Sequence, residues 1–121
     1  MTSSTRTPTV YKILAEAEWQ AAMRAGSYAG SADDARDGFI HFSTAEQLAG
    51  TAAKYFKGQP GLVLVALDAA RLGPALKWEP SRGGALFPHL HAALDVAAAT
   101  AVLPLPLGSD GVPRLPESLA P

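Results

Sequence analysis

The chain has 121 residues and a formal net charge of −1, from 10 Lys and Arg and 11 Asp and Glu residues. A chain of this length is expected to form a single domain, without room for a separate cofactor domain. The balanced charge argues against nucleic acid or an anionic membrane as a partner bound through bulk electrostatics. Cysteine is absent, which excludes disulfides, thiolate metal sites and a cysteine nucleophile and makes the cytoplasm the default location.

The ends of the chain differ in composition from its middle. Residues 1–9 lack the apolar region of a secretory signal, and no apolar run approaches the roughly 18 residues of a membrane span. We therefore expect a flexible N-terminal tail over residues 1–9 and no membrane partner. Residues 106–121 are rich in proline with little periodicity and are expected to be irregular or disordered. The domain itself is expected over residues 10–105.

Local patterns predict two early helices and several strands. Alternation predicts a first strand at 10–14, and helical spacing predicts a helix at 15–25 that ends at Gly26. The polar composition of 27–37 predicts a loop that acts as a mobile lid, and Gly38 opens a strand that ends at His41 or Phe42.

The second helix is predicted from a capping box at Ser43-Thr44-Ala45-Glu46, and Gly58 and Pro60 end it. The run at 62–67 is apolar without alternation, which predicts a central strand covered on both faces. The remaining expected elements are a turn or single helical turn at 68–72, a brief strand at 77–79, a tight loop at 80–84 and a late strand at 97–103. These elements indicate an α+β fold with a mixed, mostly antiparallel sheet.

Chemistry is concentrated in two segments, 38–44 and 78–91, which contain all three histidines of the chain. Imidazole titrates near neutral pH, and burial tunes the basicity of a carboxylate. We therefore expect a polar pocket with apolar walls. The candidate catalytic residues are His41, Ser43, Glu79 and His89, and the candidates for binding a cofactor or ligand are Lys12, Tyr28, Gln47 and His91.

Structural roles compete with these functional roles. The capping box by itself explains Ser43, and a half-buried imidazole bonded to a backbone carbonyl explains His41. Glu79 has Lys77 and Arg82 as alternative surface partners. Trp19 and Trp78 are expected in the core.

Several segments together resemble a bacterial family, domain of unknown function 952. They are Tyr11-Lys12-Ile13, Trp19, Gly26-Ser27-Tyr28, residues 37–43, Gln47, residues 62–68, Leu72, Trp78-Glu79 and residues 87–90. The resemblance covers roughly residues 10 to 105.

That family in turn resembles the ADP-ribosyltransferase fold, most visibly its RNA 2'-phosphotransferase branch. The shared order is a strand and a helix ending in Gly, a Gly-x-x-His-x-Ser strand, a helix, and an apolar strand ending in Asp. The resemblance implies a site for NAD or another ribosyl nucleotide, with a late Glu that supports an oxocarbenium-like transition state. The chain differs from this branch in having Lys12 in place of a His-Gly pair, and it offers no pair of arginines to hold a 2'-phosphate.

Three classes of function remain open from the sequence. The first is an ADP-ribosyltransferase-like enzyme or relic, in which histidines bind the ligand or transfer protons and Glu79 stabilises positive charge. The second is a non-catalytic module that binds a small molecule or a partner. The third is a metalloenzyme with His41, Glu79, His89 and His91 as ligands, although Pro88 indicates a turn rather than a strand around His89. The oligomeric state is left open.

Overall fold

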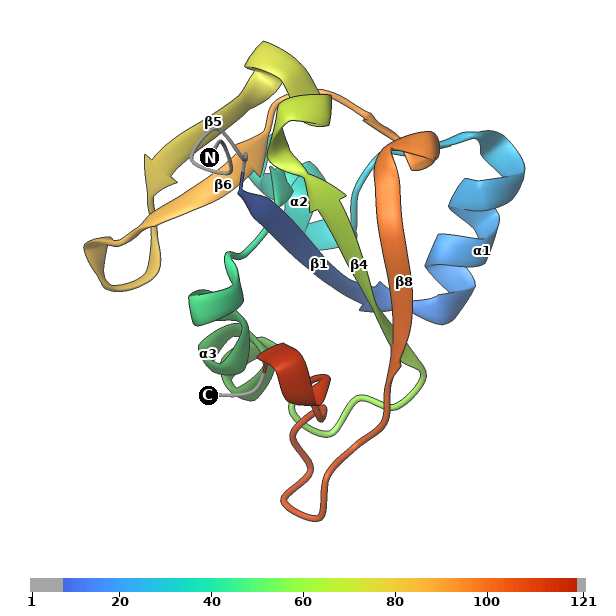
Figure 1. Ribbon diagram of the computed structural model, residues 1–121, viewed down its shortest axis with the longest axis vertical. Coiled ribbons are helices and arrows are strands. Elements are labelled where there is room, and N and C mark those ends of the chain that lie inside the picture. Colours follow the sequence, from blue (N-terminus) through green and yellow to red (C-terminus); the bar gives the residue numbers. More distant parts are fainter. Residues whose placement is uncertain (1–7, 120–121) are drawn as a thin grey trace, which may run out of the picture.

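The protein is built on a central three-stranded sheet, seen in a computed structural model that describes residues 8–119. The strands β1 (Thr9–Ala15), β4 (Leu62–Asp68) and β8 (Ala99–Leu105) lie in the order β1-β4-β8, with both pairings antiparallel (Figure 1). The predicted first, central and late strands are therefore present. The expected N-terminal tail lies mostly outside the described residues, and its last residue, Thr9, begins β1.

β4 lies between two hydrophobic clusters, which explains its unbroken apolar sequence. Leu62 and Leu64 belong to one cluster, and Val63, Val65 and Leu67 belong to the other. Successive side chains of a strand point to opposite faces, so a strand with both faces covered needs apolar residues throughout. The prediction of a buried central strand is confirmed.

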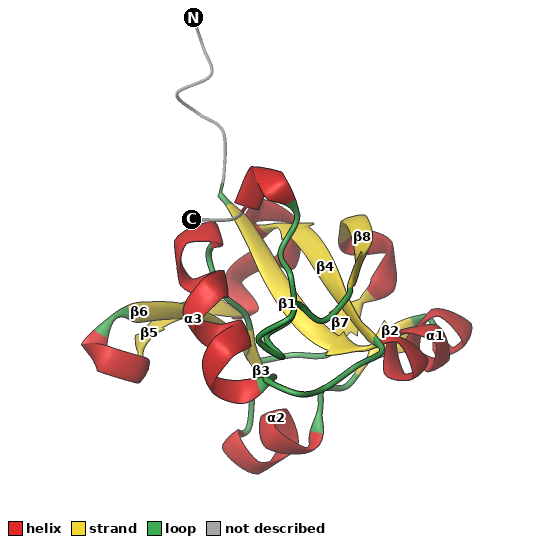
Figure 2. Ribbon diagram, turned by 90° about the horizontal axis from the view of Figure 1, so that it is seen from below, coloured by secondary structure: helices red, strands yellow, loops and turns green. Residues whose placement is uncertain are grey.

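The two longer helices pack against the central sheet through different hydrophobic clusters, α1 through one and α3 through the other (Figure 2). α1 (Glu16–Ala25) buries Trp19 and Ala22 and ends where Gly26 adopts a left-handed conformation with φ 86°, as predicted. α3 (Ala45–Tyr55) buries Leu48 and Ala52.

The capping box of α3 lies one residue later than the sequence suggested. Thr44 accepts a hydrogen bond from the Gln47 amide, and the Gln47 side chain accepts one from the Thr44 amide. Ser43 cannot take this place because its backbone is paired with Tyr11 of β1, in an isolated bridge with N···O distances of 2.8 and 2.9 Å. The predicted cap at Ser43 and Glu46 is therefore wrong, and the Ser43 hydroxyl is available for another contact.

The segment predicted as a loop over 27–37 forms two elements instead. β2 (Ser27–Tyr28) pairs with β7 (Leu94–Asp95), and α2 (Ala32–Asp37) is a short third helix. Ser31 caps α2 through a capping box completed by Asp34, which is buried. The expectation of a loop is therefore wrong for residues 32–37, where Asp34 anchors the segment to the interior, and the mobile lid stays a prediction.

A second three-stranded sheet carries the histidines. It consists of β3 (Ile40–His41), β6 (Leu86–Leu90) and β5 (Leu76–Pro80) in the order β3-β6-β5, again antiparallel. Pro88 lies inside β6, so the expected turn there is wrong. Trp78 is exposed rather than in the core, because β5 is the outer strand of this sheet.

Short 3-10 turns and a packed C-terminal segment complete the fold. The turns are η2 (Ala69–Ala75), η3 (Arg82–Gly84), η4 (Val96–Ala98) and η5 (Glu117–Leu119). After β8 the chain is largely irregular, but Val112, Leu115 and Leu119 pack against the cluster that contains α3 residues. Up to residue 119 this segment is therefore irregular and packed against the domain. No helix within residues 8–119 has the length and apolar character needed to cross a membrane.

The central strand provides a test of this packing. Leu64→Ala should lower the free energy of unfolding by about 2–5 kcal/mol, because it removes a fully buried side chain from a filled core. Leu103→Ala is the matched control, since Leu103 is paired with Leu64 across the sheet but is 37% exposed. Urea denaturation should show a clearly smaller loss for the control, and equal losses would contradict the assigned core.

Candidate functional site

A cavity of about 210 Å³ opens beside the outer edge of β1. Its polar lining residues come from β1, from α2 and the turn before it, from residues 41–43, from α3, and from the segment containing η3 and β6. Those polar residues are Tyr11, Lys12, Ser31, Asp33, Asp34, Arg36, Asp37, His41, Ser43, Thr51, Tyr55, Ser81, Arg82 and His89. Ile13, Phe42, Phe56 and Phe87 supply apolar wall, as expected for a polar pocket with apolar sides.

A buried ion pair forms part of the lining of this cavity. Lys12 shares a strand face with Val10 and Leu14, so its side chain is carried into the interior, where it is 7% exposed. Its Nζ lies 2.9 Å from Oδ2 and 3.2 Å from Oδ1 of Asp34. Burial lowers the pKa of Lys12, and the Asp34 carboxylate opposes this effect.

Asp34 uses both carboxylate oxygens to connect three parts of the chain. Besides Lys12, it accepts hydrogen bonds from the Ser31 amide and from the amide and Nδ1 of His41. Burial raises the pKa of the Asp34 carboxyl, but the His41 hydrogen bond, the Lys12 charge and the Ser31 amide together lower it by more. The pKa of Asp34 therefore lies well below its usual value, and the group is an anion at neutral pH.

His41 is fixed by carboxylates at both ring nitrogens. Nδ1 lies 2.6 Å from Asp34 Oδ1, and Nε2 lies 2.9 Å from Asp37 Oδ2. Arg36 in turn bonds Asp37, and this hydrogen bond lowers the pKa of the Asp37 carboxyl. Because both nitrogens of His41 already have partners, this ring holds the cavity wall in place and has no nitrogen left for a ligand in this arrangement.

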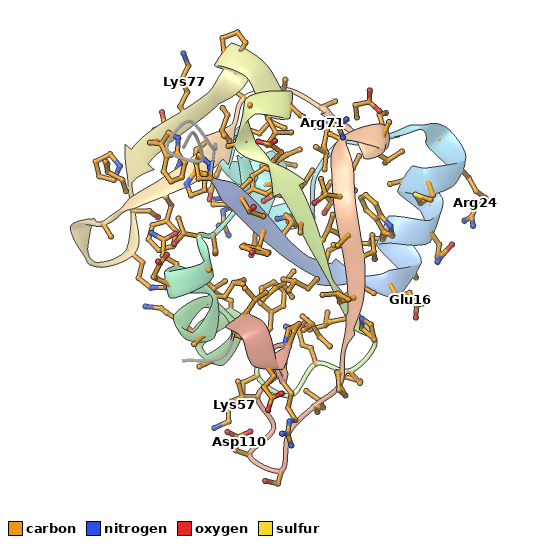
Figure 3. The ribbon with its side chains drawn as sticks, in the orientation of Figure 1. Glu16, Arg24, Lys57, Arg71, Lys77 and Asp110 are labelled. Atoms are coloured by element: carbon orange, nitrogen blue, oxygen red, sulfur yellow. The ribbon has the colours of Figure 1, made fainter. Side chains whose placement is uncertain are left out.

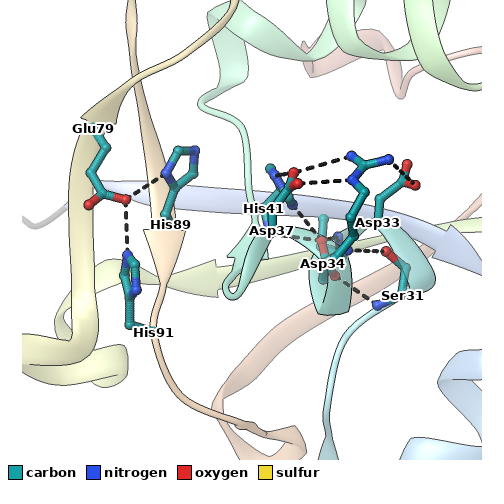
Figure 4. A network of polar contacts seen from close by, with 10 residues as sticks. Ser31, Asp33, Asp34, Asp37, His41, Glu79, His89 and His91 are labelled. Carbon is teal, nitrogen blue, oxygen red and sulfur yellow. Dashed lines mark hydrogen bonds and ion pairs between the residues drawn. The ribbon is translucent and has the colours of Figure 1, made fainter.

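His89 differs, because only one of its ring nitrogens has a partner. Nδ1 lies 2.8 Å from Glu79 Oε1, which also lies 2.9 Å from Nε2 of His91. His89 is 3% exposed, and its Nε2 is buried without a hydrogen-bond partner among the described residues. Figure 4 shows Glu79 bound to both imidazoles, apart from the group around Asp34. Hydrogen bonds from His91 and His89 lower the pKa of Glu79.

Phe39 sets the spacing of the histidine rings. Its ring stacks on His89 with a centroid distance of 4.1 Å, and it contacts His41 at 4.6 Å and His91 at 5.1 Å. His41 and His89 are cross-strand partners in β3 and β6, with their centroids 5.4 Å apart. The packing holds the rings in fixed positions, which is what a preorganised site requires.

Two hydroxyls and a guanidinium of the cavity lining form a chain of hydrogen bonds. Ser43 Oγ lies 3.0 Å from Thr51 Oγ1, and Arg82 Nη1 donates to Thr51 Oγ1 at 3.3 Å. Arg82 also lies over the rings of Phe87 and Tyr55, at 5.0 and 5.9 Å from their centroids. These contacts hold a cation at the cavity wall.

The structure brings part of the predicted site together. His41, Ser43, His89 and Lys12 line the cavity. The other four candidates lie outside its lining. Glu79 and His91 contact His89 or each other, Tyr28 contacts Glu18 at 3.3 Å, and Gln47 caps α3 and donates to the Leu86 carbonyl.

Sequence reasoning missed Asp34, Asp37, Thr51 and Arg82. Asp34 had a recognisable signal, since Ser31-x-x-Asp34 is a capping sequence and Lys12 inside an apolar strand requires a buried anion. Thr51 and Arg82 gave no such signal, because only the tertiary fold places them beside Ser43.

The metal site considered from the sequence does not form. Within residues 8–119 there is no group of three or more His, Cys, Asp or Glu side chains placed to hold a metal ion. Its four expected ligands divide between two networks, with His41 held by Asp34 and Asp37, and the other three joined through Glu79 (Figure 4).

The fold and cavity define an α+β domain with a histidine-containing polar pocket. The chain belongs to the family described as "Protein of unknown function (DUF952)", whose sequence model matches residues 13–102. It is similar to protein CC0527 from Caulobacter crescentus. The X-ray structure of that protein is 54% identical, with a TM-score of 0.89, and the match covers 92% of this chain and 97% of that one.

A solution NMR structure of CC0527 agrees, with 54% identity, a TM-score of 0.83, and coverage of 93% of this chain and 97% of that one. No curated protein matches the chain. The family predicted from the residues is therefore confirmed.

The Lys12 and Asp34 pair predicts a large effect of one substitution. Asp34→Asn should lower the free energy of unfolding by about 3–5 kcal/mol, because it leaves the Lys12 charge buried without a counterion. Asp33→Asn, at the neighbouring exposed position of the same helix, should change it by less than about 0.5 kcal/mol. Urea denaturation measures both, and similar losses would contradict a special role for Asp34.

The lowered pKa of Asp34 also predicts how stability depends on pH. Below about pH 4 the unfolded chain binds a proton at this carboxyl and the folded protein does not. The stabilisation is therefore complete above that pH and declines as the pH falls toward the folded-state pKa. Denaturation curves between pH 7 and pH 3 should show that the gap between wild type and Asp34→Asn narrows in acid, whereas a constant gap would refute the assignment.

Proposed function

We propose that the cavity binds the ribosyl part of a nucleotide and that the protein is ADP-ribosyltransferase-like. The observation that carries this proposal is Nε2 of His89, a residue of the cavity lining. This nitrogen is buried and has no hydrogen-bond partner within residues 8–119. Buried polar atoms of native proteins are almost always hydrogen-bonded, so this nitrogen calls for a ligand or an ordered water. A sugar hydroxyl is a suitable partner because it both donates and accepts.

The order of elements supports the likeness to the RNA 2'-phosphotransferase branch. The strand and helix ending at Gly26 are followed by the segment from Gly38 to Ser43, then by α3 and by the apolar strand β4, which ends at Asp68. This is the order on which the resemblance rests.

The size of the cavity limits which part of a nucleotide is enclosed. Pockets that enclose a drug-sized ligand measure about 300–1,000 Å³. A cavity of about 210 Å³ is smaller, so it suits a ribosyl group with its substituent and leaves the rest of a molecule such as NAD outside. We therefore propose that only one ribosyl group of NAD, with its substituent, enters the cavity.

The Glu79 and His89 pair supplies the chemistry in this proposal. Glu79 does not line the cavity, so it does not contact a positive charge at the ribosyl C1 directly, as the sequence suggested. In this proposal it acts indirectly, through His89. A carboxylate that accepts a hydrogen bond from Nδ1 fixes the tautomer of the ring and leaves Nε2 as the acceptor. His89 then takes a proton from the hydroxyl group or water that attacks the ribosyl C1. The bond from C1 to nicotinamide breaks, nicotinamide leaves with the bonding electron pair, and Glu79 is a positioning residue.

A module that binds without reaction is the second candidate. It is favoured by the state of His41, whose two ring nitrogens are both held by aspartates, because this leaves a single imidazole for proton transfer. Both candidates require the same cavity and differ only in whether the bound molecule is consumed.

Thermal shift with NAD, ADP-ribose, adenosine and ribose tests binding. A ligand at 100 times its dissociation constant stabilises the folded state by about 2.7 kcal/mol, so a clear rise in Tm is expected for at least one ribosyl compound. His89→Phe should abolish the rise, since it keeps a ring against Phe39 without Nε2, whereas Arg24→Gln on the far helix α1 should leave it unchanged (Figure 3).

The same samples separate the two candidates. Incubation with NAD followed by chromatography should show slow cleavage in an enzyme, and Glu79→Gln should reduce turnover by about 10²–10⁴ while retaining binding. Binding without cleavage would support the non-catalytic binding module. If no compound changes the Tm of folded protein, both candidates are refuted.

A further inference from the structure

Arg82 differs from the other cations of the cavity. Three cationic side chains line it, and two have carboxylate partners: Lys12 with Asp34, and Arg36 with Asp33 and Asp37. Within residues 8–119, no ion pair is formed by Arg82. Its hydrogen bonds go to neutral acceptors, the Thr51 hydroxyl and the Gln47 carbonyl at 3.4 Å. Arg82 therefore places a positive charge at the cavity wall that has no counterion within residues 8–119.

The position of this guanidinium is determined by its surroundings. Besides its contacts with Tyr55 and Phe87, it lies against Gly50 of α3, where a Cβ atom would be 3.0 Å from Nη2. Glycine inside a helix costs roughly 1 kcal/mol relative to alanine, so its presence at this place indicates that the space is used. The absence of a side chain at position 50 lets Arg82 approach the helix.

The neighbouring hydroxyls extend the donor set toward the cavity. Thr51 Oγ1 accepts from Arg82, and its own proton is then available for Ser43 Oγ at 3.0 Å. In that arrangement the Ser43 proton remains free to be donated, and Ser43 lines the cavity while being 5% exposed. A guanidinium and an aligned hydroxyl chain together form a site for an acceptor that carries negative charge.

From these contacts we infer that Arg82, Thr51 and Ser43 form a subsite for a phosphoryl group attached to the ribosyl ligand. The inference rests on the proposed function, because it names the substituent that the ribosyl group carries. Phosphate suits these donors, since its oxygens accept several hydrogen bonds at once. Its negative charge complements the Arg82 guanidinium, which forms no ion pair within residues 8–119. The other two cations of the lining, Lys12 and Arg36, already have carboxylate partners, so we assign the phosphoryl group to Arg82.

Calorimetry with matched pairs of ligands tests the subsite. Ribose 5-phosphate and ADP-ribose are compared with ribose and adenosine, on wild type, Arg82→Gln, Thr51→Val and the remote control Arg24→Gln. The phosphorylated compounds should bind wild type more tightly. Arg82→Gln should weaken them by about 10- to 100-fold, the usual loss for a hydrogen bond to a charged group, and leave ribose and adenosine unaffected. Thr51→Val should cause a smaller loss, and Arg24→Gln none.

Inorganic phosphate is the competitor in the second arm. It should displace ribose 5-phosphate from wild type and should have no measurable effect on what binding remains in Arg82→Gln. The Tm of each variant is measured first, so that a loss of binding is scored only on folded protein.

The outcomes separate the subsite from the proposed function. Equal affinity for phosphorylated and unphosphorylated partners, or an unchanged affinity in Arg82→Gln, overturns the subsite and leaves the ribosyl pocket standing. Loss of all binding in His89→Phe, together with selective loss in Arg82→Gln, supports both. No binding of any compound to folded wild type overturns both.

Discussion

The arrangement of this molecule depends on one buried charge, the ammonium group of Lys12. A strand that carries lysine on its inward face requires an anion within reach, because an unpaired charge in the interior costs several kcal/mol. Asp34 supplies that anion and is brought there by α2. The same carboxylate then holds the His41 ring, so the strand, the short helix and the second sheet all contact this one side chain.

The two histidines that line the cavity both have carboxylate partners, but they differ in how many ring nitrogens those carboxylates bind. His41 has aspartates at both nitrogens, which leaves a ring that supports the wall. His89 has Glu79 at one nitrogen and, within residues 8–119, no partner at the other, which leaves a polarised, buried acceptor. The difference lies in the count of carboxylates around each ring, and Phe39 keeps both rings in place. The two rings, with these different surroundings, lie 5.4 Å apart from centroid to centroid.

The sequence was most informative where the signal was local. The apolar run at 62–67 and the helix that ends at Gly26 were predicted because strand burial and helix termination depend on neighbouring residues. The histidine pocket was predicted only in part. Asp34 was missed because its burial depends on Lys12, 22 residues away in the chain, and Trp78 was misplaced because an outer strand of a small sheet leaves even tryptophan exposed.

The shared contacts of Lys12 and His41 with Asp34 also limit how sequences of this family can diverge. Position 12 cannot lose its charge without leaving an unbalanced carboxylate at position 34. A neutral residue at position 34 leaves the charge at position 12 buried without this counterion. Position 41 is tied to the same choice through its ring and its amide. These three positions should therefore change together during evolution, as a set inherited whole or replaced whole, while the exposed acid at position 33 is free to drift.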